Sequence, residues 1–158
     1  MIHPPTAHPD SSPEPVPMTA SDCDEVLAFW RDMPGVGLSD ADTPDRLSSF
    51  LRRNPGLSLV LRHDGRIVGA VLCGHDGRRG YLHHLAVAPD VRRRRLGRVL
   101  VERCLLKLGL LSIQKCNIFV YADNDDGIGF WRQNGWHDRS DLKVMQRPLS
   151  PGHSQSDQ

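Results

Sequence analysis

Four consecutive arginines, residues 92–95, are the side chains in this sequence that point most directly to chemistry. An apolar strand pattern ends just before them at Pro89, and a helical pattern begins just after them at Leu96. A helix N-terminus presents unpaired N–H groups and a partial positive charge, so it attracts anions. The planar guanidinium group also matches the geometry of phosphate. We therefore predict that this turn binds a phosphate or a pyrophosphate.

The distribution of charge along the chain favours a compact anion as the ligand. The 158 residues carry a formal net charge of only +1, yet residues 78–107 hold nine basic against two acidic residues. Residues 1–45 hold nine acidic residues against one basic residue. A nucleic-acid interface spreads its basic residues along a surface and interleaves aromatic side chains. Because the charge here is concentrated in one turn, a nucleic-acid partner is not favoured, and a solvated basic face is the simplest competing interpretation.

The hydrophobic periodicity places this turn inside an α+β domain with a mixed sheet. Ser21 and Thr43 are typical caps for two helices that precede the first strands. The later elements are three strands, a helix from Leu96, a strand, a helix and a last strand, and the strands are expected over residues 57–62, 66–73, 81–88, 115–121 and 142–147. The resulting order is ααβββαβαβ, with helices packed on the sheet. We expect Trp30, Phe50 and Phe119 in the core.

Composition sets the limits of the domain and excludes several classes of protein. Residues 1–17 contain six prolines and are expected to form a disordered tail, residues 18–149 the domain, and residues 150–158 a polar tail. No apolar stretch is long enough for a membrane span, and the first residues do not resemble a secretory signal. The four widely spaced cysteines predict buried, reduced thiols in a cytoplasmic protein. No metal site is expected.

The segment around the arginines resembles the cofactor motif of the GCN5-related N-acetyltransferase (GNAT) family. Leu85-Ala86-Val87-Ala88-Pro89, Arg92 and Gly97 match its L-A-V-x-P-x-x-R-x-x-x-x-G pattern. Downstream, Asn124 and the block GFWRQNGW at residues 129–136 resemble a second motif of the family. The glycine-rich reversal at residues 74–80 is similar to that of bacterial members related to ribosomal-protein alanine acetyltransferases.

This resemblance implies an enzyme that transfers an acetyl group from acetyl-CoA to a primary amine by direct attack. The acceptor would be a protein N-terminus, a lysine or a small-molecule amine. The sheet would splay beside the strand at residues 81–88 and hold the pantetheine arm, with helices on both faces. An N–H near Val87 would polarise the thioester carbonyl. The implied cofactor-binding residues are Leu85, Ala86, Val87, Arg92, Arg93, Arg94, Arg95, Leu96, Gly97, Arg98 and Asn124.

Two residues depart from the family pattern. Arg95 stands where the family has a glycine, and Trp131 stands where it has the tyrosine expected to protonate the departing thiolate. An indole N–H is not an acid near neutral pH, although a thiolate is already a tolerable leaving group. Trp131 is a candidate catalytic residue by its position in the motif. His84 is the candidate base, with ordered water as an alternative. Simple strand alternation predicts that His83 and His84 point to opposite faces.

Two other functions stay open at this stage. The departures at Arg95 and Trp131 are compatible with a catalytically weak CoA-binding regulatory module, and the arginine cluster alone is compatible with a nucleic-acid-binding protein. The sequence does not decide between a monomer and a homodimer, and it does not identify the acceptor.

Overall fold

The computed structural model describes residues 12–151, in which a five-stranded sheet has the order β1-β2-β3-β4-β5. All neighbouring strands are antiparallel except β4 and β5, which are parallel. The strands are β1 (Val16–Pro17), β2 (Leu59–His63), β3 (Arg66–His75), β4 (Gly80–Val87) and β5 (Cys116–Ile118). The helices are η1 (Ala20–Asp22), α1 (Cys23–Arg31), α2 (Pro44–Arg53), η2 (Pro89–Arg94), α3 (Leu96–Leu110) and α4 (Asp125–Gln133).

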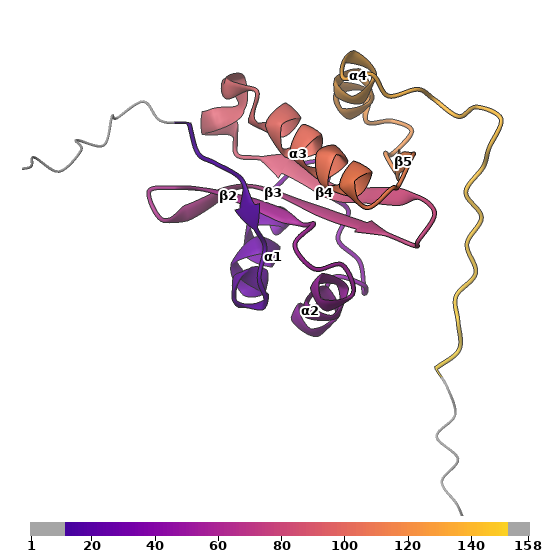
Figure 1. The fold of residues 1–158 in the computed structure, drawn as a ribbon, viewed down its shortest axis with the longest axis horizontal. Helices are drawn as coiled ribbons and strands as arrows, with labels where there is room; N and C mark the ends of the chain where they lie inside the picture. Colours follow the sequence, from indigo (N-terminus) through magenta and orange to yellow (C-terminus); the bar gives the residue numbers. More distant parts are fainter. Residues whose placement is uncertain (1–11, 152–158) are drawn as a thin grey trace, which may run out of the picture.

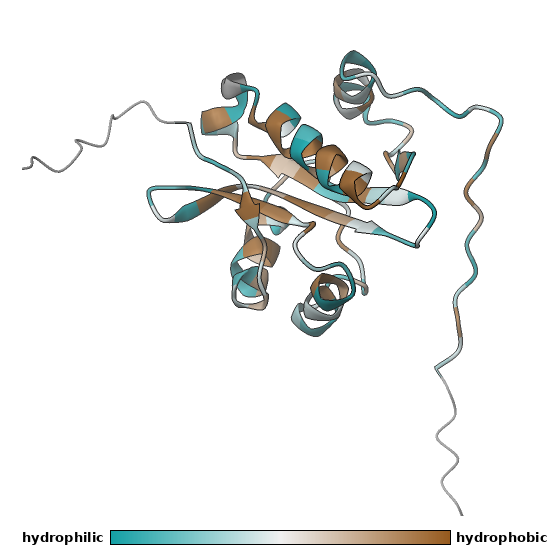
Figure 2. Ribbon diagram, viewed as in Figure 1, coloured by the Kyte–Doolittle hydropathy of each residue, from teal (hydrophilic) through white to brown (hydrophobic). Residues whose placement is uncertain are grey.

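Helices cover both faces of the sheet, as the sequence predicted. Figure 1 shows α1 and α2 on one face and α3 on the other. Strand β3 is buried on both faces from Ile67 to Gly74, because one core lies on each side of it. On the α3 side, β-strand residues pack on Leu96, Leu100 and Cys104, and on the other side they pack on Trp30 and Leu47. Apolar residues accordingly dominate the central strands in Figure 2.

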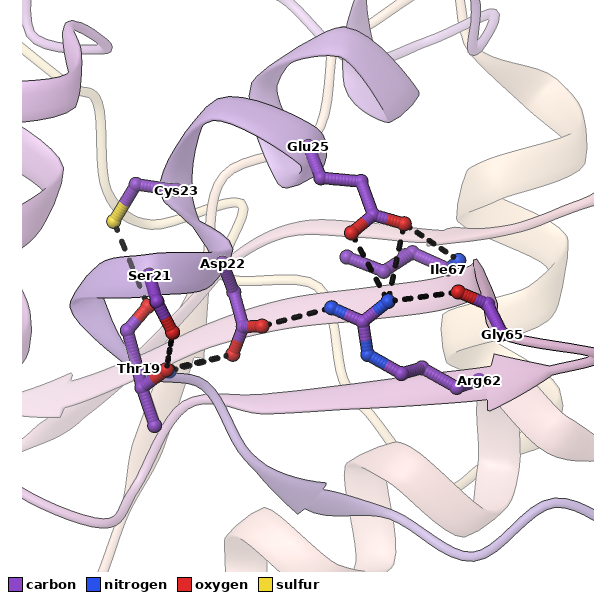
Figure 3. Close-up of polar contacts among 8 residues, drawn as sticks. All are labelled: Thr19, Ser21, Asp22, Cys23, Glu25, Arg62, Gly65 and Ile67. Atoms are coloured by element: carbon purple, nitrogen blue, oxygen red, sulfur yellow. Dashed lines mark hydrogen bonds and ion pairs between the residues drawn. The ribbon is translucent and has the colours of Figure 1, made fainter.

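A cluster of ion pairs fixes the start of α1 against the hairpin of β2 and β3 (Figure 3). The Arg62 guanidinium donates to Asp22 Oδ1 at 2.8 Å and to Glu25 Oε2 at 3.0 Å. Asp22 also accepts a hydrogen bond from the Thr19 amide at 2.8 Å. Burial acts to raise the pKa of Asp22, but the hydrogen bonds from Thr19 and Arg62 outweigh it and lower that pKa overall. Thr19 and Asp22 therefore organise this helix start, rather than Ser21 as predicted.

The other predicted boundaries match closely, with instructive exceptions. The Thr43 side chain caps α2 by accepting from the Arg46 amide at 3.3 Å. Within the predicted N-terminal tail, Val16 and Pro17 instead form β1, because they pair with Val60 and Leu59 at the edge of the sheet. Residues 1–11 and 152–158 lie outside the described residues, so the rest of both tails stays a prediction.

The predicted last strand over residues 142–147 is wrong for this structure. Residues 142–147 form neither helix nor strand, and their side chains are exposed because no neighbouring strand pairs with them. The predicted strand at residues 115–121 is shorter, since only Cys116–Ile118 pairs with β4. Phe119, expected in the core, is 61% exposed beyond the paired part, whereas Trp30 is fully buried.

Candidate active site

The sheet opens where β4 and β5 stop pairing. Pairs between the two strands run only from Gly80–Cys116 to Leu82–Ile118, while β4 continues to Val87. The Ala88 amide donates to Val68 O at 2.7 Å on the β3 side. Because backbone groups alternate in direction along a strand, those of Val87 and, two residues earlier, Leu85 face the opening. The splayed sheet that the family resemblance implied is therefore present in this chain.

The opening leads directly to the N-terminus of α3. Arg95 follows the short helix η2 with φ 57° and ψ 27°, and α3 begins at Leu96. This left-handed conformation is the one that glycine adopts without strain, so Arg95 keeps the backbone shape that the family's glycine would give. The Arg92 side chain donates from Nε to Val87 O at 3.0 Å and so secures the end of β4 to the turn. The side chains of Arg93 and Arg94 lie outside the described part of the chain.

Gly97 keeps the first turn of α3 close to its neighbours. A Cβ at this position would lie 3.4 Å from Cζ of Phe130 and 3.8 Å from Cγ2 of Val87. A larger side chain would therefore push against α4 or extend into the mouth of the helix. The sequence placed Gly97 and Leu96 at this helix start correctly, and Leu96 itself is a core residue with 1% exposure.

A bulge in β4 changes the direction of its two histidines. Ala86 pairs with Ala70 and His83 pairs with Leu72, so Val71 alone faces both His84 and Leu85. His84 has φ 57°, which accommodates the extra residue. His83 meets Phe50 of α2 edge to face and His84 contacts Trp30 of α1 in the same way, so both rings lie on the α1/α2 face. The prediction of opposite faces is wrong, because the bulge interrupts the alternation.

His84 forms a buried pair with Asp42 from the loop between α1 and α2. The His84 Nε2 atom lies 2.9 Å from Asp42 Oδ1, and the Asp42 side chain is only 7% exposed. The Ser39 amide donates to the other carboxylate oxygen at 2.8 Å, so the carboxylate is held from both sides. When Nε2 carries the proton, Nε2–H donates a hydrogen bond to Asp42 Oδ1 and Nδ1 keeps a lone pair. The arrangement therefore orients the imidazole as a proton acceptor.

His83 belongs to an aromatic cluster at the same opening. Its ring stacks on Tyr81 and Phe119, with ring centroids 6.3 and 6.2 Å away. Burial is the main cause that lowers the pKa of His83, and the neighbouring His84 lowers it further while Asp42 acts in the opposite direction. The imidazole of His83 is consequently held neutral at neutral pH.

The loop between α1 and α2 crosses the opening at three points. Asp42 bonds His84, and the Tyr121 hydroxyl lies against Gly37, where a Cβ would be only 2.0 Å away. Near Gly35, the Asn124 amide group lies 3.1 Å from the position that a Cβ would take. Asn124 Oδ1 also accepts from the Gly127 amide at 3.0 Å and caps α4. The structure thus gives Asn124 a structural role, and its predicted contact with the cofactor stays a prediction.

Trp131 is packed within α4 and its flanking turn. Its ring meets Phe130 and Trp136 edge to face, with centroids 5.2 and 5.0 Å apart. These rings rest against the core on the α3 side of the sheet. The packing explains the tryptophan without a catalytic role, and such a role stays a prediction.

The structure has one hollow on the α1/α2 face and another along α3. On the α1/α2 face, a hollow of ≈ 190 Å³ is lined by Phe50, Tyr81, His83 and neighbouring residues. On the outer side of α3, a hollow of ≈ 520 Å³ is lined by Arg95, Arg98, Arg103 and neighbouring residues. Within residues 12–151 no group of His, Cys, Asp or Glu is arranged to hold a metal ion, and no helix there is long and apolar enough to cross a membrane.

Residues 23–136 match the acetyltransferase (GNAT) family. The chain belongs to the GNAT acetyltransferase family. An acetyltransferase of Yersinia enterocolitica is 32% identical over 127 residues, which cover 80% of this chain and 89% of the relative. An acetyltransferase of Yersinia pseudotuberculosis is 36% identical over 126 residues, with the same coverage of 80% and 89%. The predicted family and enzyme class, an acetyl-CoA-dependent acetyltransferase, are confirmed.

Solved structures confirm the predicted fold of this GNAT protein. PaiA N-acetyltransferase from Thermoplasma acidophilum, in complex with coenzyme A, superposes with a TM-score of 0.70 at 17% identity, covering 79% of this chain and 89% of that one. The ribosomal-protein-alanine N-acetyltransferase from Brucella melitensis biovar Abortus 2308 has a TM-score of 0.68 at 17% identity, covering 87% of this chain and all of that one. The predicted likeness to ribosomal-protein alanine acetyltransferases therefore holds for the fold.

Sequence reasoning missed Asp42 and Tyr121 as residues of this site. The pattern Ser39-x-x-Asp42 before a helix cap is typical of a fixed turn, and it was available in the sequence. That pattern gives no indication of the partner, because His84 lies 42 residues further along the chain. The same holds for Tyr121 and Gly37, which meet only in the folded chain.

Proposed function

We propose that this acetyltransferase moves the acetyl group of acetyl-CoA to a cationic primary amine that enters from the α1/α2 face. The single observation that carries the proposal is the open edge of β4, which lies between the amide-lined start of α3 and the Asp42–His84 pair. The first feature suits a phosphorylated carrier, and the second suits removal of a proton from an amine. They meet along the five-residue stretch His83–Val87 of β4.

The residues on the α3 side would hold the carrier. The amides from residue 93 onward converge at the start of α3 and would bind the pyrophosphate. Val87 and Leu85 turn backbone groups toward the opening, where they would pair with the pantetheine arm. The arginine-lined hollow on the outer side of α3, with Arg95 and Arg98, would take the remaining phosphate. Gly97 leaves the space that this contact needs.

The residues on the other side would prepare the amine. His84, oriented by Asp42, would accept the proton of the incoming ammonium so that its lone pair is free to attack. Attack on the thioester carbonyl forms the C–N bond and breaks the C–S bond, and the electron pair of that bond leaves with sulfur. The second proton that the nitrogen loses passes to this thiolate and gives free CoA thiol. The N–H of Val87 would stabilise the charge that develops on the carbonyl oxygen, a role worth about 3 kcal/mol for one donor.

The charge of the loop between α1 and α2 favours a cationic acceptor. Residues 32–45 hold four aspartates and no basic residue, and three of the four, Asp32, Asp40 and Asp45, are exposed. A cleft lined by one sign of charge raises the local concentration of an oppositely charged substrate. The small hollow beside His83 is lined by Arg53 as well as Asp76 and by no residue of this loop, so it would admit one aminoalkyl group but adds no net negative charge. A lysine side chain, a protein N-terminus or a small polycationic amine fits this description, and the cytoplasmic location stays a prediction.

The experiment that tests the proposal measures release of free CoA thiol with a panel of amines at saturating acetyl-CoA. The panel contains lysine peptides, peptides with a free N-terminus, polyamines and aminoglycosides. For the best acceptor, His84→Gln is expected to lower kcat by about 100-fold with little change in the Kd of CoA. Asp42→Asn is expected to lower kcat less and to change its pH profile, because the imidazole keeps its position but loses its carboxylate.

His137→Gln is the matched control, because His137 is exposed in the segment that follows α4. CoA binding without turnover of any amine would instead favour a CoA-binding regulatory module. Full activity in a folded His84→Gln variant would remove His84 from the chemistry and leave ordered water as the base.

A further inference from the structure

The outer edge of β5 is open in this structure. Strand β5 is the last strand of the sheet, and within the described residues it pairs only with β4. The next three residues, Phe119, Val120 and Tyr121, are 61%, 37% and 61% exposed. An unpaired edge with exposed apolar side chains is a template for another strand. The edge offers about six residues for such pairing, from Cys116 to Tyr121.

The same chain carries an extended segment that lacks a partner. Residues 142–147 read Leu-Lys-Val-Met-Gln-Arg, with Leu142 and Val144 alternating with polar or long side chains, and Pro148 ends the run. This is the pattern of a strand with one apolar face. Leu142, Val144 and Met145 are nevertheless 59%, 73% and 93% exposed. Large apolar side chains in a row are seldom left in water without a partner.

Local contacts direct this segment away from its own sheet. After α4, Gly135 takes φ 88° and the Trp136 amide bonds Trp131 O at 3.0 Å, which closes the helix. Arg132 then pairs with Asp138, its Nε donating at 3.0 Å. A second pair, Arg139 with Asp141, lies in the turn before Leu142. In Figure 1 the chain beyond α4 runs away from the helices and strands. The local contacts therefore set the direction in which residues 142–147 leave the domain.

We propose that residues 142–147 add as a strand to the β5 edge of a second copy of this chain, so that two copies exchange these segments. The lengths match, since the edge and the segment each offer about six residues. The apolar sides match as well. Ile118 and Cys116 face the core on the α3 side, and Leu142 and Val144 would extend that layer. Lys143 and Met145 would then face the side of Phe119 and Tyr121, so the partner copy contributes to the rim of the opening.

Light scattering after size exclusion tests the assembly with the full chain. The parent chain is expected to have twice the single-chain mass of 17.7 kDa. Val144→Pro removes an N–H that a strand pair needs, so this variant is expected at the single-chain mass. Val144 is exposed and outside every helix and strand of the single chain, so the variant is expected to keep the helical circular dichroism of a folded domain while losing the strand signal that the exchanged segments contribute. Ser150→Pro, beyond Pro148, is the matched control and is expected to stay at twice the mass.

Cross-linking separates exchange between copies from folding back within one copy. Chains with Val120→Cys are co-expressed with chains with Val144→Cys, both with Cys116→Ser, and treated with a short bis-maleimide. Exchange predicts a product that joins position 120 of one chain to position 144 of the other, identified by mass spectrometry. A monomeric parent chain, a Val144→Pro variant that stays dimeric, or the absence of the product that joins position 120 of one chain to position 144 of the other would each overturn the proposal. These measurements do not depend on acetyl transfer, so they stand or fall separately from the proposed activity.

Discussion

The two sides of the opening differ in charge and in how the chain builds them. At the start of α3, one stretch of residues 87–98 supplies the strand end, the turn and the helix N-terminus, with Arg92, Arg95 and Arg98 around it. On the other side, the acidic loop at residues 32–45 meets β4 through a bond between Asp42 and His84. The first side is basic and local in sequence, whereas the second is acidic and assembled from distant segments.

This difference indicates a division of tasks. Backbone amides at a helix start bind an anion whatever the side chains are, so the carrier side depends on backbone shape and small residues. Proton removal from an amine depends on one imidazole and its carboxylate, so the acceptor side depends on side-chain geometry. Variants that change one side should leave the other unaffected.

The largest effect is expected at Gly97, on the carrier side. Gly97→Trp would fill the mouth of α3 and press on Phe130, because a Cβ there already lies 3.4 Å from that ring. We expect the Kd of CoA to rise by about 100-fold, which is about 2.7 kcal/mol. Isothermal titration calorimetry measures it. Gly109→Trp on the same helix is the control, since a Cβ there meets nothing within 4 Å. Unchanged affinity in a folded Gly97→Trp variant would contradict the placement of the pyrophosphate.

A smaller effect is expected from reversing a charge on the acceptor side. Asp40→Lys in the exposed loop should lower kcat/KM for a cationic amine by about tenfold at low salt, and by less at high salt, because screening weakens the attraction. The Kd of CoA should not change. Asp24→Lys makes the same change in charge on α1, away from the loop. Equal losses in both variants would mean that net charge, rather than the loop, attracts the acceptor.

Arg95 separates backbone shape from charge on the carrier side. The left-handed conformation costs a residue with a Cβ about 1 kcal/mol relative to glycine. Arg95→Gly is therefore expected to be about 1 kcal/mol more stable than Arg95→Ala in urea unfolding, although both lack the guanidinium. Arg98 lies within α3, where glycine is a poorer helix former than alanine. Arg98→Gly is therefore expected to be less stable than Arg98→Ala. An Arg95→Ala variant as stable as Arg95→Gly would show that the turn relaxes away from this conformation.

The same contrast explains how much of the molecule the sequence could predict. The start of α3, the cap at Thr43 and the reversal at Gly135 were predictable because caps, prolines and glycines act within a few residues. The bulge at His84 was not, because the extra residue appears only when β4 is matched against β3. The error about the two histidine faces follows directly from it.

The C-terminal segment shows a second limit of sequence reasoning. The alternation of Leu142 and Val144 indicates a strand, but a strand needs a neighbour, and a pattern does not say which chain supplies it. Val16 and Pro17 show the reverse case, since two residues in a proline-rich stretch pair with β2 because its edge is free. Local pattern predicts the capacity to form a strand, and the available edge decides whether one forms.

The smallest expected effect concerns pH and again distinguishes the two sides. Burial, with His84 close by, lowers the pKa of His83 below its ordinary value of 6.5, so the native state favours the neutral ring. Above about pH 6.5 the His83 ring is neutral in both the folded and the unfolded chain, so its ionisation does not lower the free energy of unfolding. As the pH falls below this value toward the folded pKa, the unfolded chain takes up the proton first and the free energy of unfolding decreases. His83→Phe keeps a neutral ring beside Phe50, Tyr81 and Phe119 and should flatten this part of the dependence. Urea unfolding of both proteins between about pH 7.5 and 5 measures the difference. Parallel curves would contradict the burial of a neutral His83, whereas the arginines of the α3 side stay charged throughout this range and contribute no such slope.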